Sequence, residues 1–157
     1  MLLSSSFLNG GMIPKRFTCD GENVSPPLRW RGTPPNVGSF ALVFQDMSGE
    51  TGGARHWAVF DIPPYHKELT EGAGFPEGFE DFRHAVNDFR RLGYVGPCPK
   101  ALQPAHPYRF KLFALSCKEL PIRTHPSCEE VEREAERHKL AEATLEGFYE
   151  RARRESA

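Results

Sequence analysis

The sequence predicts one mostly β domain: a β-sandwich of Greek-key type with flanking helices and a long C-terminal amphipathic helix. Three observations support this fold class. Short apolar runs rich in β-branched and aromatic residues alternate with clusters of glycine and proline, which number 14 each. The last thirty residues change to a helical spacing of apolar positions. The length of 157 residues gives one domain a real core and leaves little room for a second, so we expect a single domain over residues 1–157.

Two strands are expected at the centre of the sandwich. SFALVFQ (39–45) and HWAVFDI (56–62) are apolar on both faces, as strands covered on each side are. A third run, YRFKLFAL (108–115), alternates at first, with Arg109 and Lys111 on the outward face. This alternation predicts a half-exposed strand.

The C-terminal segment carries the signals of a helix. Ser127 and Glu130 form a capping-box pattern, in which the hydroxyl accepts a hydrogen bond from the backbone three residues later. The apolar stripe comprises Val131, Ala135, His138, Ala141, Leu145 and Phe148. Gly147 indicates a break or a close contact, and Arg151, Arg153 and Arg154 suit the end of a helix dipole. We expect this helix to seal the core.

Composition and charge exclude several classes of protein. Lys and Arg total 20 against 21 for Asp and Glu, a formal net charge of −1, so a nucleic-acid binder is not expected. No apolar run has transmembrane length and no secretory signal is expected. The cysteines show no CxxC pair, which favours reduced thiols in a cytoplasmic protein; they are Cys19, Cys98, Cys117 and Cys128.

The residues that could do chemistry are polar groups at the ends of the apolar strands. Asp46 closes the first strand, His56 opens the second, and His106 with Tyr108 opens the third. Nucleophile-elbow, Walker, dinucleotide-binding and HExxH motifs are missing. If the three strands are neighbours with suitable directions, these four side chains converge at one end of a sheet.

Each of these residues also has a structural interpretation. Asp46 after a strand is a common turn former, and His56 beside Trp57 suits a partly buried, hydrogen-bonded histidine. His106 follows a loop stiffened by prolines, which either stabilise the fold or hold the imidazole in place: Pro97, Pro99, Pro104 and Pro107. The remaining histidines are expected in loop, surface or structural positions: His66, His84, His125 and His138.

These residues, together with a backbone donor, are expected to form a binding pocket for an anion. Gly96 lacks a Cβ, which allows a ligand to approach a backbone N–H. Two imidazoles and the Tyr108 hydroxyl add donors for a phosphate or a carboxylate, and Asp46 would orient one imidazole and favour its protonated form. A stiffened pocket binds well because it loses little freedom on capture.

The sequence resembles the phosphatidylethanolamine-binding protein family, in its bacterial and archaeal branch often described as Raf kinase inhibitor-like. The resemblance extends over nearly the whole chain. It is carried by IPKRFTCDGENVSPPLRW (13–30), SFALVFQD, HWAVFDIP, the L-x-E-G of residues 69–72, NDFRRLGYVGPCPK (87–100), HPYRFKLFAL and HKLAEATLEGFYER (138–151).

The resemblance implies a β-sandwich with flanking helices and a small anion pocket at one end. The family's D-P-D-x-P Asp falls on Asp46, its H-[WF] His on His56, and the His and Tyr of its last motif on His106 and Tyr108. Gly96 matches the glycine whose backbone faces the anion. This chain departs from the pattern at Met47, Ser48 and Gly49, at Leu102 and at Pro107, which changes one wall of the pocket.

The function expected from these residues is noncatalytic binding of a small anionic ligand: phosphate, carboxylate or a phospholipid headgroup. No cofactor is expected. The alternative is a hydrolase that uses Asp46, His56 and His106 as a two-His-one-carboxylate metal site or as an acid/base set. A kinase or protease partner is a third possibility, and Phe148 with Tyr149 could contribute apolar surface to a homodimer.

Overall fold

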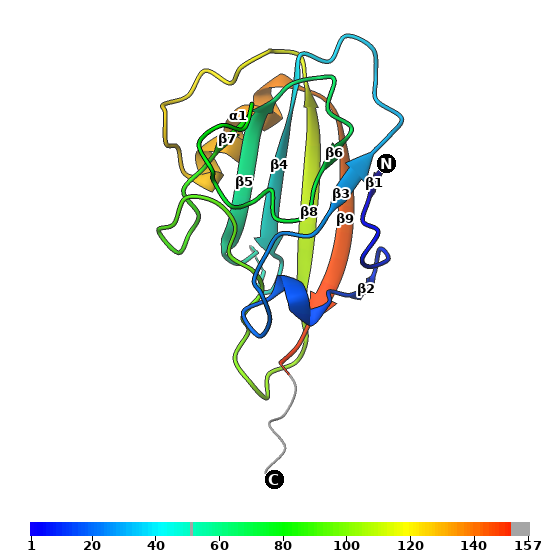
Figure 1. Cartoon of the computed structure of the whole chain (residues 1–157), viewed down its shortest axis with the longest axis vertical. Helices are drawn as coiled ribbons and strands as arrows, with labels where there is room; N and C mark the ends of the chain where they lie inside the picture. Colours follow the sequence, from blue (N-terminus) through cyan, green and yellow to red (C-terminus); the bar gives the residue numbers. More distant parts are fainter. Residues whose placement is uncertain (51, 152–157) are drawn as a thin grey trace.

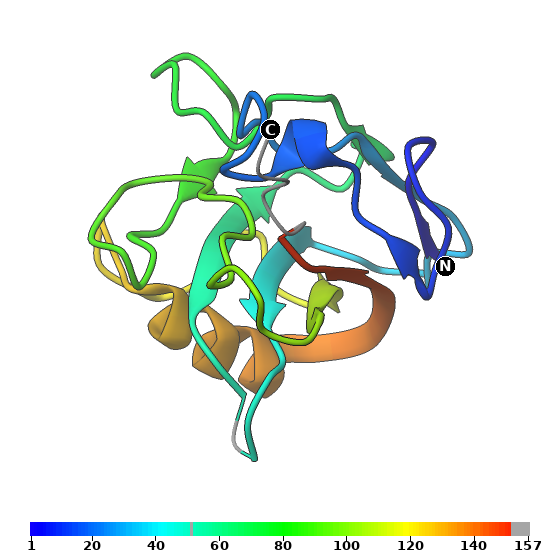
Figure 2. The ribbon, with the colours of Figure 1, turned by 90° about the horizontal axis from the view of Figure 1, so that it is seen from below.

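The fold has three layers: a small sheet, a large sheet and a helix (Figures 1 and 2). The computed structural model describes residues 1–50 and 52–151. The small sheet has the order β1-β3-β6, with β1 at Leu2–Leu3, β3 at Leu28–Trp30 and β6 at Glu68–Leu69. A short 3-10 helix, η1 at Lys15–Phe17, follows the N-terminal strands.

The large sheet has the order β2-β9-β8-β4-β5-β7. Its four long strands are β4 (Ser39–Asp46), β5 (Arg55–Ile62), β8 (His106–Leu115) and β9 (Lys139–Tyr149), and neighbours among them are antiparallel. The edges are β2 (Gly11–Met12), parallel to β9, and β7 (Arg83–His84). The mostly β fold class is therefore confirmed, with both predicted central strands in the middle of the large sheet.

Two hydrophobic cores cover the two faces of the large sheet. The core between the sheets contains Trp30 from β3 and Phe44, Trp57 and Phe110 from the large sheet. On the opposite face, Phe113 and its neighbours pack against the helix. Strand β8 is half exposed only near its start, because the helix also buries the side chains of its last residues on this face. These two faces explain why β4 and β5 are apolar on both sides.

The C-terminal helix is present but shorter than predicted. Helix α1 spans Cys128–His138, and Ser127 accepts the expected hydrogen bond from the Glu130 backbone. The prediction of helix beyond His138 is wrong, because residues 139–149 form strand β9, whose burial alternates with a period of two from Ala141 onward.

Gly147 lies in a close contact rather than at a helix break. A Cβ built on it would lie 2.8 Å from Ile13 Cγ1 and 3.2 Å from the Gly11 carbonyl oxygen, so glycine lets β2 approach β9. Arg151 does not complement a helix dipole; its guanidinium pairs with Asp20 at 2.8 Å. Arg153 and Arg154 lie outside the described residues. In the part of the chain that the structure describes, no helix has both the length and the apolar character needed to cross a membrane.

Candidate anion-binding pocket

One cavity of about 490 Å³ collects all the side chains that the sequence singles out. It lies where β4 ends and β5 and β8 begin, the lower end of the long strands in Figure 1. Asp46, His56, Gly96, His106 and Tyr108 all line it. The structure therefore brings the five predicted residues together, while their role in binding a ligand stays a prediction.

Strand register places Asp46 and Tyr108 beside each other. In the antiparallel pair β4 and β8, Asp46 lies opposite Tyr108, and His106 opens β8 two residues earlier. Residues two apart on a strand share a face. His106 and Tyr108 therefore point to the same side, and their rings stack with centroids 6.4 Å apart.

A shift of strand register directs His56 into the same cavity. Phe44 pairs with Trp57 and Gln45 with Arg55, so His56 is the extra residue of a bulge between β4 and β5. Regular alternation would place it on the helix-covered face with Ala58. The bulge instead brings its ring within 5.6 Å of Phe44 and 5.7 Å of Tyr108, centroid to centroid.

Asp46 acts both as a turn former and as a partner for His106. Its Oδ1 accepts the backbone N–H of Ser48 at 2.8 Å, and its Oδ2 lies 2.9 Å from His106 Nδ1. Burial raises the pKa of Asp46, but the hydrogen bonds from Ser48 and His106 outweigh it, so the net pKa is below the ordinary value. The carboxylate is thus ionised at neutral pH and fixes the orientation of the His106 ring.

His56 is buried and held by the backbone. Its side chain is enclosed by Phe44, Phe89 and Tyr108, and its Nδ1 lies 2.7 Å from the Val95 carbonyl oxygen. That carbonyl can only accept, so Nδ1 carries the proton and Nε2 is left for another partner. Burial lowers the pKa of His56, against the opposing effects of the Val95 carbonyl and Asp46. The ring is therefore uncharged at neutral pH.

Tyr108 supplies a hydroxyl that keeps its proton. Burial, followed by the negative charge of Asp46, raises its pKa well above the ordinary value. Among the described residues, neither its hydroxyl nor the Nε2 atoms of His56 and His106 have a protein hydrogen-bond partner. Three polar atoms of the cavity wall are thus left for a ligand.

The predicted role of Gly96 as a free backbone donor is wrong. Its N–H donates to Asn23 Oδ1 at 2.8 Å. A Cβ at this position would lie 2.2 Å from the Phe17 carbonyl oxygen and 2.5 Å from the Asn23 side chain. Glycine is needed here because the segment around Gly96 packs directly on residues 17–23, so its missing Cβ serves packing rather than the approach of a ligand.

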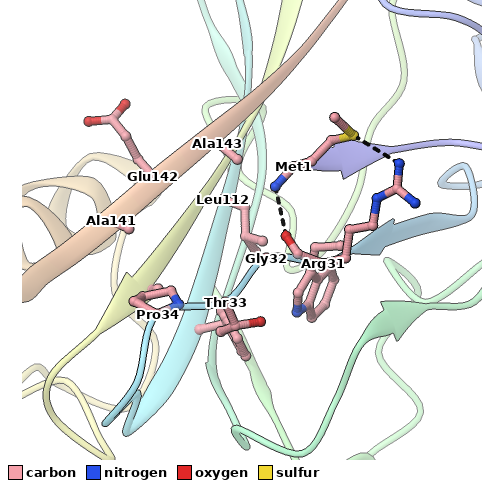
Figure 3. A pocket seen from close by; sticks show the side chains of 12 residues that line it. Met1, Arg31, Gly32, Thr33, Pro34, Leu112, Ala141, Glu142 and Ala143 are labelled. Carbon is pink, nitrogen blue, oxygen red and sulfur yellow. Dashed lines mark hydrogen bonds between the residues drawn. The ribbon is translucent and has the colours of Figure 1, made fainter.

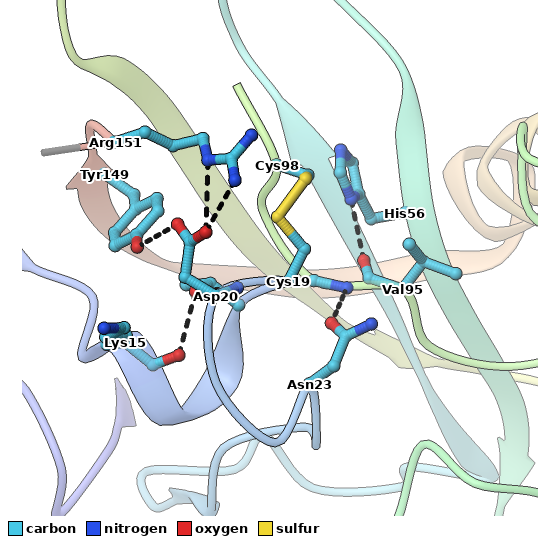
Figure 4. Close-up of a disulfide and its surroundings, with 11 residues drawn as sticks. Lys15, Cys19, Asp20, Asn23, His56, Val95, Cys98, Tyr149 and Arg151 are labelled. Atoms are coloured by element: carbon cyan, nitrogen blue, oxygen red, sulfur yellow. Dashed lines mark hydrogen bonds and ion pairs between the residues drawn. A yellow bond between two sulfur atoms is a disulfide. The ribbon is translucent and has the colours of Figure 1, made fainter. Parts of the chain in front are cut away.

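The prediction of four reduced thiols is also wrong. Cys19 and Cys98 form a disulfide with a Cα–Cα distance of 5.4 Å (Figure 4). The same two segments are joined by the Cys19 N–H to the Pro97 carbonyl at 3.1 Å and by the Tyr94 hydroxyl to the Phe17 carbonyl at 2.6 Å. Cys117 and Cys128 are free. The disulfide borders the cavity and ties its wall to the N-terminal segment.

Several cavity residues were not singled out by the sequence, among them one aromatic and two basic side chains. Phe89 packs edge-on against His56, with centroids 4.8 Å apart, while Arg91 and Lys100 are exposed residues of the lining. Only the sequence NDFRRLGYVGPCPK, part of the family resemblance, contained a signal for them. Nothing in its pattern indicated which of its charges face the cavity.

A second cavity lies at the other end of the sheet and has a different character. It measures about 50 Å³ and lies between the N-terminal segment and strands β8 and β9, lined by Met1, Leu112, Ala141 and Ala143 among others (Figure 3). The Met1 amino group donates to the Arg31 carbonyl at 2.8 Å. None of the five predicted residues lines it, so the chemistry expected from the sequence belongs to the larger cavity.

Acid is expected to destabilise the protein through two buried histidines. Burial lowers the pKa of His84, as it lowers that of His56. Protons therefore bind the unfolded chain first, and the stability present above the unfolded pKa of about 6.5 is lost as the pH falls toward the folded values. Each histidine contributes at most about 1.4 kcal/mol per pH unit in this window. Urea midpoints at about pH 7.5 and pH 5.5 measure the loss.

An exposed histidine serves as the control for this prediction. His125 lies at the surface, so His125→Gln should keep the full acid dependence. A urea midpoint that stays constant between the two pH values would contradict the assignment of two buried neutral histidines.

The fold and the cavity define a class: a two-sheet β protein with an outer helix and a histidine-lined cavity at the end of its central strands. The sequence profile described as "Phosphatidylethanolamine-binding protein" matches residues 3–150. The chain belongs to this family, as the resemblance implied.

Individual relatives agree with this membership. A protein of Aquifex aeolicus, named "UPF0098 protein", is 39% identical over 150 residues, which cover 96% of this chain and 88% of the relative. "Putative lipoprotein LppC" of Mycobacterium tuberculosis is 38% identical over 115 residues, covering 73% of this chain and 54% of the relative. The crystal structure of E. coli YbcL, described as a new member of the mammalian PEBP family, has a TM-score of 0.90 at 28% identity, covering 97% of this chain and 98% of that one.

Proposed function

We propose that the protein binds a phosphate, a carboxylate or a phospholipid headgroup in this cavity and does not transform it. One observation carries the proposal: two imidazoles have Nδ1 committed to protein acceptors, while Nε2 of each has no described partner. The Tyr108 hydroxyl lies beside them. The Tyr108 hydroxyl can donate to an oxygen of an anionic group, and each Nε2 can accept the proton of that group or donate to it once the ring is protonated.

The charges of the site indicate that an anion binds together with a proton, which either the ligand or the solvent supplies. The Nε2 of uncharged His56 accepts, so it can receive the proton of a P–OH group or take up a proton with the ligand. The Tyr108 hydroxyl donates in either case. Asp46 carries the one carboxylate of the cavity wall among the described residues, and its oxygens are occupied by Ser48 and His106.

Inorganic phosphate is the probe that tests this proposal. Titration should perturb the NMR signals of the His56 and His106 rings, and His106→Gln should weaken binding roughly tenfold to hundredfold, as the loss of a charge-assisted hydrogen bond does. The matched control is His125→Gln, which removes an exposed histidine away from the cavity and should leave the affinity unchanged. Histidine signals that do not move at tens of millimolar phosphate would overturn the proposal.

The pair of His106 and Asp46 also favours a second candidate, a hydrolase, because an imidazole oriented by a carboxylate is a general-base arrangement. Among the described residues the cavity lining contains no serine, no threonine and no free cysteine, and a water molecule activated by His106 would act as the nucleophile of such a hydrolase. Within residues 1–50 and 52–151, no three His, Cys, Asp or Glu side chains are grouped to hold a metal ion. Turnover of an aryl phosphate that is lost in His106→Gln would favour the hydrolase over simple binding.

The partners and the location expected from the sequence stay proposals. A regulatory role toward a kinase or protease would use this cavity as the docking point of a charged group. Phe148 is 37% exposed and is available for a homodimer contact, whereas Tyr149 is buried. The expectation of a cytoplasmic location rested on reduced thiols. The disulfide removes that support, since disulfides persist mainly in oxidising compartments. Light scattering decides the oligomeric state, and fractionation of native cells with thiol counting decides the compartment.

A further inference from the structure

We propose that Arg91 and Lys100 make the cavity selective for phosphomonoesters whose substituent carries a carboxylate, over those whose substituent carries an ammonium group. This inference rests on the proposed function, because it concerns the substituent of a ligand whose phosphate group is bound at the two imidazoles. It assigns the specificity of the site to its rim rather than to its interior.

The rim is cationic and its cations are not neutralised by the protein. Arg91 and Lys100 both line the cavity and are exposed. Across the described residues, neither side chain has a carboxylate within salt-bridge distance or a hydrogen-bond partner, whereas Arg55, Lys111 and Arg151 on nearby elements are each paired. A charge without a protein partner is available to a ligand.

The acidic groups around the cavity do not offset this rim. The two carboxylate oxygens of Asp46 accept hydrogen bonds from the Ser48 backbone and from the His106 ring. Asp88 is near enough to influence the His56 ring, but it accepts the Arg55 backbone N–H at 2.7 Å and does not line the cavity. Asp20, next to Cys19, is held by Tyr149 and Arg151. A substituent that extends out of the cavity therefore passes two unpaired cations and no unpaired carboxylate on the part of the wall that the structure describes.

Electrostatic interactions with the rim then rank the affinities of ligands that carry the same phosphate group but different substituents. A phosphate bound at the imidazoles fixes one end of the molecule, so its substituent must pass the rim. A carboxylate there gains from both cations, and an ammonium group is repelled by them. Exposed charge pairs contribute modestly, about two- to fivefold in affinity for each cation, and salt screens them.

Three probes of similar length isolate the substituent: phosphoglycolate, ethyl phosphate and ethanolamine phosphate. Their affinities for the full chain are measured by calorimetry at about pH 7.5, where a phosphomonoester is mostly dianionic. Phosphoglycolate should bind tightest and ethanolamine phosphate weakest, with a spread that shrinks at high salt. In each of the variants Arg91→Gln and Lys100→Gln, the ratio of the affinities of the two charged probes should fall by at least about two- to fivefold, because the lost cation attracts one probe and repels the other.

The control charge lies at the far end of the sheet. Lys118 is an exposed lysine just beyond β8, at the end opposite to the cavity, so Lys118→Gln should keep the full ratio. If ethyl phosphate and inorganic phosphate fail to bind at all, the proposed function falls, and this inference with it. If they bind but ethanolamine phosphate is equal to or tighter than phosphoglycolate, or if the ratio survives both rim variants, the rim assignment alone is overturned.

Discussion

Removing the Cys19–Cys98 disulfide is expected to lower the free energy of unfolding by about 2–5 kcal/mol. The two cysteines are 79 residues apart in the sequence, so the bond closes a long loop in the unfolded chain. Long loops lose the most conformational entropy when they are closed, which places this bond toward the upper part of that range. The double variant Cys19→Ser/Cys98→Ser avoids a leftover thiol.

Urea unfolding followed by the fluorescence of the buried Trp30 and Trp57 measures this effect. Cys117→Ser is the matched control, because Cys117 is a free, partly exposed thiol, and its change should stay within about 0.5 kcal/mol. A double variant as stable as the parent protein would show that the bond does not constrain the chain. Phosphate affinity should fall in the same variant, since the bond ties the wall that holds His56 through Val95.

Phe44→Ala is expected to lower the free energy of unfolding by about 3–5 kcal/mol and to weaken phosphate binding as well. Phe44 is fully buried and stacks on Phe110 with centroids 4.0 Å apart. The rings of His56 and Tyr108 also lie against it, at 5.6 and 5.8 Å. A cavity in place of this ring would let both ligand-facing side chains shift, so stability and affinity should fall together.

Phe40→Ala separates these two effects. Phe40 is a buried phenylalanine of the same strand and the same core, but it packs against Trp30 at the end away from the anion pocket. Its loss of stability should be similar, with phosphate affinity nearly unchanged at a temperature where both variants are folded. Equal effects on affinity would mean that Phe44 has no particular role beneath the pocket.

The central strands could be predicted from the sequence because their signal is local. Residues 40–44 and 57–60 are apolar without interruption, and a strand covered on both faces needs that composition. The C-terminal strand was missed because its apolar positions fit two periods. Ala141 and Leu145 are four residues apart, which places them on one side of a helix and equally on one side of a strand. Backbone pairing with β8 stabilises the strand over the helix, and the local sequence pattern does not show that pairing.

The residues of the candidate site were likewise predicted only in part. Asp46, His56, His106 and Tyr108 were found because polar residues at the ends of apolar strands stand out and match family motifs. The contact between residues 17–23 and 94–98 was not found, because it joins segments with no shared pattern. Gly96 and the two bonded cysteines were therefore misinterpreted. Arg91 and Lys100 were overlooked because only the folded loop shows which surface charges border a cavity.

The sulfur bridge turns residues 19–98 into a closed covalent ring, with the rest of the chain as two open tails. Asp46 and His56 belong to the ring, whereas His106 and Tyr108 belong to the C-terminal tail. The pocket therefore forms where the ring meets the tail, joined by the ladder between β4 and β8. A single backbone cut anywhere inside the ring would leave the molecule in one piece, whereas a cut between the ring and β8 would divide the binding residues between two separate chains.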